Sequence, residues 1–173
     1  MKVTGYMLRE AIKQHELRRE AAVRAFGDSL KVFPGEVKDS PVDIIGQFLA
    51  AERAIAALQT AQMKYNLTVK VELYGHGWDR TTMTLGQAIK LVGGEGRAEK
   101  LWRSAAGPKK DRYYRDVDEI DPNHIRAQPT VKPQEAVKLA TAAGKRAGAL
   151  RAAIATANAK EIEIEDLSPA LFE

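Results

Sequence analysis

The stretch SPVDIIGQFLAAERAIAALQTAQMKY, residues 40–65, decides the fold of this chain. Ser40 can accept a free backbone N–H at a helix start, Pro41 suits the first helical position, and Asp43 complements the positive end of the helix dipole. Apolar side chains then recur at helical spacing at Ile44, Phe48, Ala51, Ile55 and Leu58. A helix of about 25 residues is about 37 Å long, more than a compact domain of this size needs. The stretch therefore predicts one arm of a long, rod-like helical hairpin.

Composition bounds the class of protein. The chain has 173 residues and no cysteine, which excludes disulfides, thiolate metal ligands and cysteine nucleophiles. It has no apolar run of about 18 residues and no signal-peptide pattern, so we expect a protein of the cytoplasm, or of a particle assembled there, without membrane contact. The net charge of +4, from 27 basic and 23 acidic residues, is too small to indicate a nucleic-acid partner by itself.

Residues 6–26 predict the helix that pairs with this arm. Its apolar face is interrupted by His15 and Arg19, which favours either a hydrogen-bonded polar layer between two helices or side chains that reach the edge of the stripe. Glu52 lies within the apolar face of the second helix. If the two helices are antiparallel, an ion pair between Arg19 and Glu52 becomes possible.

The loop between these helices, residues 27–39, contains a Pro-Gly turn signal and four apolar side chains, at Leu30, Val32, Phe33 and Val37. Apolar loops of this kind usually fold back on their own hairpin. They can also dock on a neighbouring subunit.

The hydrophobic period changes after residue 65. Residues 68–74 alternate with period two, and a glycine-rich turn followed by a return to residue 83 predicts a β-hairpin. Residues 160–165 alternate in the same way, and we expect them to join that hairpin. Between them, residues 84–106 predict helix that the glycines at 93, 94 and 96 break or kink.

The segment of residues 109–132 is polar and rich in proline, and we predict an extended connector. Its first part interleaves basic and aromatic side chains, as binders of single-stranded nucleic acid do. The candidate residues are Lys109, Lys110, Arg112, Tyr113, Tyr114 and Arg115. Neighbouring acidic residues almost cancel this charge, so an ordinary connector or a strap between subunits is the other interpretation.

The last long helix, residues 133–158, carries small residues spaced by four, at Ala136, Ala140, Gly144, Gly148 and Ala152. Glycines inside a helix cost about 1 kcal/mol each relative to alanine, so they imply a close approach of another backbone. The chain then ends in an apolar turn. We predict a self-association surface formed by Ala140, Gly144, Gly148, Leu171 and Phe172.

Taken together, these segments predict a mainly α fold with a long antiparallel helical hairpin, a third long helix and a small antiparallel β element. We expect one structural domain built from residues 1–108, the connector 109–132 and a closing part, residues 133–173.

Five short motifs, taken in order, resemble a family of small uncharacterised bacterial and phage proteins, some of which carry the label septicolysin. The motifs are LREAI at 8–12, YNLT at 65–68, TLGQAI at 84–89, RYY at 112–114 and LRAAI at 150–154. The resemblance implies a helical rod with a small β element, without a settled activity and without catalytic residues to transfer. The label itself implies a thiol chemistry that a chain without cysteine cannot perform.

No pattern in the sequence predicts catalysis, a metal site or a cofactor. His15, His76 and His124 lack companions at metal-ligand spacing, and neither a nucleophile elbow nor a zinc-type histidine pair occurs. We therefore expect a non-enzymatic structural or assembly protein, such as a virion or particle component, that self-associates or packs into a larger complex. The alternative is a nucleic-acid-binding accessory protein that uses the basic and aromatic connector.

Overall fold

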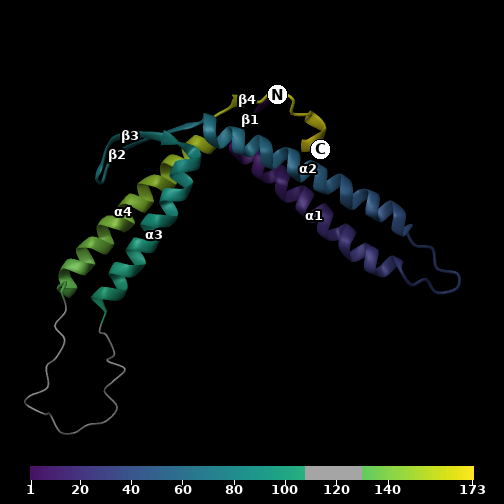
Figure 1. Ribbon diagram of the computed structural model, residues 1–173, viewed down its shortest axis with the longest axis horizontal. Helices are drawn as coiled ribbons and strands as arrows, with labels where there is room; N and C mark the ends of the chain where they lie inside the picture. The colour runs from purple at the N-terminus through teal and green to yellow at the C-terminus, as the bar shows by residue number, and fades with distance from the viewer. Residues whose placement is uncertain (108–129) are drawn as a thin grey trace, which may run out of the picture. The chain divides into compact units, whose positions relative to one another are not determined.

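A computed structural model describes residues 1–107 and 130–173. The elements of these residues, in chain order, are β1 (Lys2–Val3), α1 (Gly5–Ser29), α2 (Pro41–Thr68), β2 (Lys70–Gly75), β3 (Trp78–Thr84), α3 (Leu85–Ala106), α4 (Pro133–Asn158), β4 (Ile162–Glu163) and a 3-10 turn, η1 (Pro169–Phe172). Figure 1 shows them along the chain. The fold is mainly α with small antiparallel sheets, as the sequence predicts.

The chain divides into two compact units, and each contains segments from both sides of the connector. Unit 1 comprises residues 1–71, 82–86 and 154–173, and unit 2 comprises residues 72–81 and 87–153. The predicted division into residues 1–108, 109–132 and 133–173 follows chain order, whereas the units do not. Most of the predicted connector lies outside the described residues.

Unit 1 is built on the antiparallel hairpin of α1 and α2 (Figure 1), which confirms the predicted helical hairpin. Side chains cap both helix starts, because the hydroxyl of Thr4 accepts from the backbone N–H of Met7 at 3.1 Å and that of Ser40 from Val42 at 3.3 Å. The two helices bury their facing stripes, which include Leu8, Ala11, Ile44, Ala51, Ala54, Ile55, Leu58 and Ala61. Burial of these stripes, and not the intrinsic preference of either helix, stabilises the pair.

The prediction that residues 160–165 join the β2–β3 hairpin is wrong. Strand β4 pairs instead with β1, antiparallel, with Lys2 opposite Glu163 and Val3 opposite Ile162. The cause is the position of the end of α4, where Asn158 lies against Gly5 at the start of α1. The residues that follow α4 therefore meet the N-terminal residues first, and Met1 and Ile164 exchange two backbone hydrogen bonds of 2.9 Å.

The expected β-hairpin forms as β2 and β3, with Val71 and Leu73 buried on one face of β2. Its turn has positive φ at Gly75, His76 and Gly77, so two of these three positions hold the residue that adopts this conformation without strain.

Unit 2 contains most of α3 and α4, which lie side by side in Figure 1. Of the predicted break or kink at the glycines, the break is wrong, since α3 is continuous from Leu85 to Ala106. The kink stays a prediction. An ion pair of 3.0 Å from Glu95, within the glycine run, to Arg146 of α4 holds this part of the helix to its neighbour. Contact with α4 thus outweighs the local preference of glycine.

Candidate assembly surface

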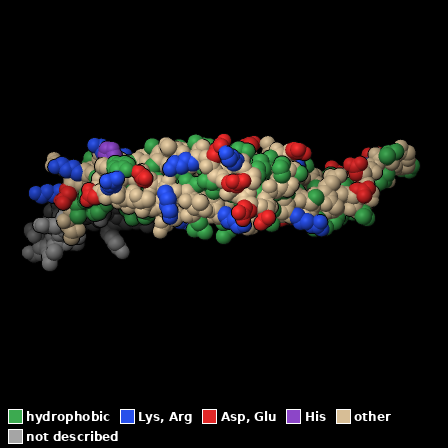
Figure 2. Space-filling view, turned by 90° about the horizontal axis from the view of Figure 1, so that it is seen from above, with side chains coloured by type: hydrophobic (Ala, Val, Ile, Leu, Met, Phe, Trp, Pro, Cys, Tyr) green, Lys and Arg blue, Asp and Glu red, His purple; other side chains and the backbone are tan. Residues whose placement is uncertain are grey.

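The tip of the α1–α2 hairpin exposes a cluster of apolar side chains, which we call the apolar tip. It comprises Leu30, Val32, Phe33, Val37 and Val42. Each of these side chains is between 56% and 95% exposed. Figure 2 shows hydrophobic side chains at its right-hand end. The loop therefore does not fold back on its own hairpin, which was one of the two alternatives left open by the sequence.

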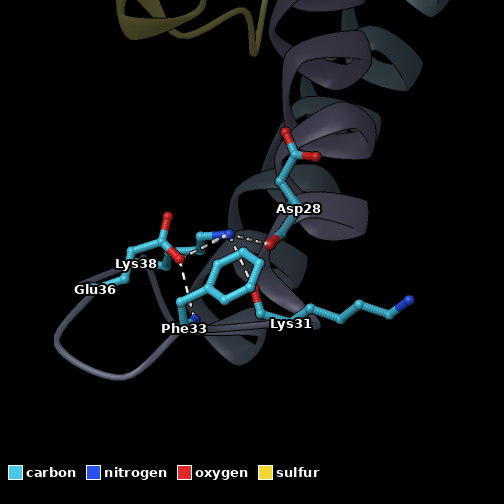
Figure 3. A network of polar contacts seen from close by, with 5 residues as sticks. All are labelled: Asp28, Lys31, Phe33, Glu36 and Lys38. Atoms are coloured by element: carbon cyan, nitrogen blue, oxygen red, sulfur yellow. Dashed lines mark hydrogen bonds and ion pairs between the residues drawn. The ribbon is translucent and has the colours of Figure 1, made fainter.

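A network of polar contacts holds this loop in place (Figure 3). The Nζ atom of Lys38 donates to the carbonyl oxygens of Asp28, at 3.0 Å, and Lys31, at 2.9 Å, and lies 3.5 Å from the carboxylate of Glu36. That carboxylate accepts from the backbone N–H of Phe33 at 3.2 Å, and the N–H of Glu36 donates to the carbonyl of Phe33 at 3.0 Å. The polar groups thus satisfy one another inside the loop, and the apolar side chains remain outside.

An exposed apolar stripe continues from the tip along α2. Val42, Ile45 and Leu49 follow one another at intervals of three and four residues, so they lie on one face of the helix. Ile45 and Leu49 are 42% and 44% exposed. The stripe thus begins at Val42, which is also part of the apolar tip, and both belong to unit 1.

The C-terminal turn η1 docks on α1 of its own chain. The carbonyl oxygen of Leu171 lies 3.0 Å from Nε2 of His15, and that of Glu173 accepts from Arg18 at 2.8 Å. Leu171 and Phe172 are accordingly half-buried. These two residues of the predicted self-association surface already have contacts within the chain.

The small residues of α4 do not all lie on the same face of the helix. Its buried face contains Ala136, Ala140, Ala143, Ala147 and Leu150, which alternate steps of four and three. Residues spaced strictly four apart do not stay on one face of an α-helix, because the helix has 3.6 residues per turn. Each step of four residues rotates the position by about 40°, so such a row leaves the buried face within three steps. Gly144 is half-buried, and a methyl group there would lie 3.2 Å from the carboxylate of Glu99, whereas Gly148 is exposed with open space beside it.

Of the residues predicted for self-association, Ala140 therefore faces the interior of unit 2, Gly144 lies at the edge of the contact with α3, and Gly148 faces outward. The three α4 residues belong to unit 2, whereas Leu171 and Phe172 belong to unit 1. Self-association through these residues stays a prediction.

Arg19 and Glu52 form the expected ion pair, with 3.1 Å between Nη1 and Oε1. Their side chains are 34% and 41% exposed, so water screens the pair. Arg19 thus lies at the edge of the contact between α1 and α2, and we expect its ion pair with Glu52 to add little to the free energy of unfolding.

A buried tyrosine that the sequence analysis did not single out joins the end of α2 to the end of α4. The hydroxyl of Tyr65 lies 2.8 Å from the carbonyl oxygen of Ala157 and 2.7 Å from that of Lys160. Burial raises the pKa of Tyr65 above its ordinary value of 10.0, because the phenolate would lose its hydration. The only signal in the sequence was the position of Tyr65 at the end of the long apolar stripe.

The residues proposed for nucleic-acid contact, Lys109, Lys110, Arg112, Tyr113, Tyr114 and Arg115, all lie outside the described residues. Within residues 1–107 and 130–173, no three His, Asp or Glu side chains come together as a metal site would require. None of the described helices combines the length and apolar character needed to cross a lipid bilayer.

No family model matches this chain, and no curated protein matches it. Among solved structures, it resembles a functionally unknown conserved protein from Corynebacterium diphtheriae. The TM-score is 0.66 at 18% identity, over 94% of this chain and 100% of that one. This likeness shows a shared fold. The resemblance to septicolysin-like proteins stays a prediction.

Proposed function

We propose that this chain is a non-enzymatic structural or assembly protein, and that it self-associates through the apolar tip and the stripe beside it. The observation that carries the proposal is the exposure of four large apolar side chains on a loop held by internal hydrogen bonds, and of Val42 at the adjoining start of α2. A loop that is already ordered has less conformational entropy to lose when it docks.

The apolar tip and the stripe beside it supply part of the area that a protein interface needs. Burying a fully exposed Val, Leu, Ile or Phe side chain contributes about 1.5–3 kcal/mol. A stable interface typically buries about 800 Å² on each partner, which exceeds the area of five side chains. Ile45 and Leu49 extend the surface along α2 toward that area.

Sedimentation velocity over a range of protein and salt concentrations tests the proposal. We expect species heavier than the 19.0 kDa chain, with a mass that rises with protein concentration and does not fall as salt rises, because apolar contacts are not screened by ions. A wild-type chain that remains at 19.0 kDa at every concentration would refute it.

Two matched variants locate the surface. Phe33→Ser with Val37→Ser should dissociate the assembly, and both positions are too exposed for the change to unfold the hairpin. Met63→Ser with Leu67→Ser, at positions that are each 66% exposed near the other end of α2, should leave it intact. Equal effects of the two variants would show that the tip is not the contact.

The same proposal locates the protein in the cytoplasm or inside a particle built there, of which a virion is one example. A chain without cysteine has no disulfide to form and does not depend on an oxidising compartment. Fractionation of cells that make the protein, followed by detection of the chain in particles or in the soluble cytoplasmic fraction, tests this location.

A further inference from the structure

The small net charge of the chain hides an uneven distribution between the units. Unit 1 has twelve Lys and Arg residues against thirteen Asp and Glu, whereas the described part of unit 2 has ten against five. Residues 108–129 contain five of each kind. The whole positive excess of the protein therefore belongs to the helices and hairpin of unit 2.

Part of this charge gathers at a depression on α3 and α4. The depression has a volume of about 540 Å³ and is lined by Val92, Gly93, Gly96, Arg97, Glu99, Lys100, Arg103 and Arg151. Glu99 is paired with Arg103 at 2.8 Å. Within the described residues, no carboxylate lies within 4.0 Å of Arg97, Lys100 or Arg151.

Two glycines form the floor on which the guanidinium groups lie. A methyl group at Gly93 would be 3.4 Å from Nη1 of Arg97, and one at Gly96 would be 3.9 Å from Nη2 of Arg151. Positions three apart on a helix are neighbours, about 5–6 Å apart at their Cβ atoms, so the two guanidinium groups share one side of α3. Because neither glycine has a side chain, both guanidinium groups can lie close to the backbone of α3 on this side of the helix.

We propose that this depression binds the phosphate groups of a single nucleic-acid strand. Arg97, Lys100 and Arg103 follow one another every three residues, so they extend about 9 Å along α3. This length is greater than the width of a single phosphate group. Guanidinium groups and lysine are the usual partners of phosphate oxygens. A membrane surface fits less well, because Val92 is the one large apolar side chain in the lining and a surface-binding helix needs an apolar face.

The full-length protein and a fluorescent single strand of about 20 nucleotides test the proposal by anisotropy at several salt concentrations. Three phosphate contacts give a slope of about −2 in log K against log salt, so binding should weaken about 20-fold between 50 and 200 mM salt. The variant with Arg97→Gln, Lys100→Gln and Arg151→Gln should lose this slope. All three side chains are exposed, so the fold is expected to persist.

The matched control variant carries Arg9→Gln, Lys13→Gln and Arg53→Gln. It loses the same net charge from exposed positions of unit 1 and should bind like the wild type. Equal losses in both variants, or no binding by the wild type, would overturn the proposal. Pyrophosphate and polyglutamate serve as competitors. Displacement of the strand by either one, at equal concentration of charge, would assign the depression to a small phosphorylated ligand or to an acidic protein instead.

Discussion

The hydroxyl of Tyr65 offers a sharp test of how the ends of α2 and α4 are joined. Tyr65→Phe removes the O–H group that lies within hydrogen-bond distance of the carbonyl oxygens of Ala157 and Lys160, and keeps the ring. The carbonyl of Ala157 also accepts the backbone N–H of Lys160 at 3.2 Å, so the main loss falls on the carbonyl of Lys160. Lys160 is exposed and its bond to Tyr65 is only part-buried, so water can replace part of it and we expect a loss of about 1 kcal/mol, at the lower end of the range for an unsatisfied group. For a chain of this length, that loss lowers the melting temperature by about 3 °C.

Thermal and urea unfolding, followed by far-ultraviolet circular dichroism, measure this difference. Tyr6→Phe is the control, because its hydroxyl also donates to a backbone carbonyl, that of Ala155, but at an exposed position. We expect that change to alter the free energy of unfolding by less than about 0.5 kcal/mol. If Tyr65→Phe were no more costly than Tyr6→Phe, the hydroxyl of Tyr65 would not join the two helix ends.

The pH dependence of the same pair gives a second readout. Because burial raises the pKa of Tyr65, the folded chain holds the phenolic proton more tightly than the unfolded chain does. The resulting stability is fully present below the unfolded pKa of about 10 and is lost as pH rises through the higher folded value. The difference between wild type and Tyr65→Phe should therefore shrink above pH 10. A constant difference up to pH 11 would contradict this assignment.

Three further variants test the packing by urea unfolding. Gly5→Ala should cost about 1–3 kcal/mol, because its methyl group would overlap the side-chain oxygen of Asn158, and a neutral result would exclude that contact. The pair Arg19→Met and Glu52→Leu should change stability by no more than about 1 kcal/mol, because both side chains are partly exposed, and a larger loss would show a buried pair. Gly94→Ala should stabilise α3 by about 0.5–1 kcal/mol, because nothing lies within 4 Å of the added methyl group, and a loss would show that this helix needs the glycine.

The long hairpin could be predicted because its signals are local. A cap at Ser40, a proline at the first turn and an apolar stripe over the following residues determine where α2 begins and which side it buries. The same stripes bring Arg19 opposite Glu52 once the helices are antiparallel, so the ion pair followed from the sequence as well.

The errors arose where distant segments meet. The alternation at residues 160–165 predicted a strand but contained no information on its partner, and β1 is two residues long, too short to give a pattern. The glycines of α3 predicted a break because local preference cannot include the contact between Glu95 and Arg146. The basic depression could not be predicted from the sequence for the same reason, since Arg151 is about fifty residues from Arg97 in sequence.

The two proposed surfaces differ in both chemistry and location. The apolar tip belongs to unit 1, whose charges nearly cancel, and the basic depression belongs to unit 2, which holds the positive excess. Apolar association withstands salt, whereas phosphate binding weakens steeply with it. A chain with both surfaces could therefore remain assembled while it releases a nucleic-acid strand. Because the surfaces share no residue, substitutions at one should leave the other's response to salt unchanged, unless assembly itself gathers several basic depressions along one strand.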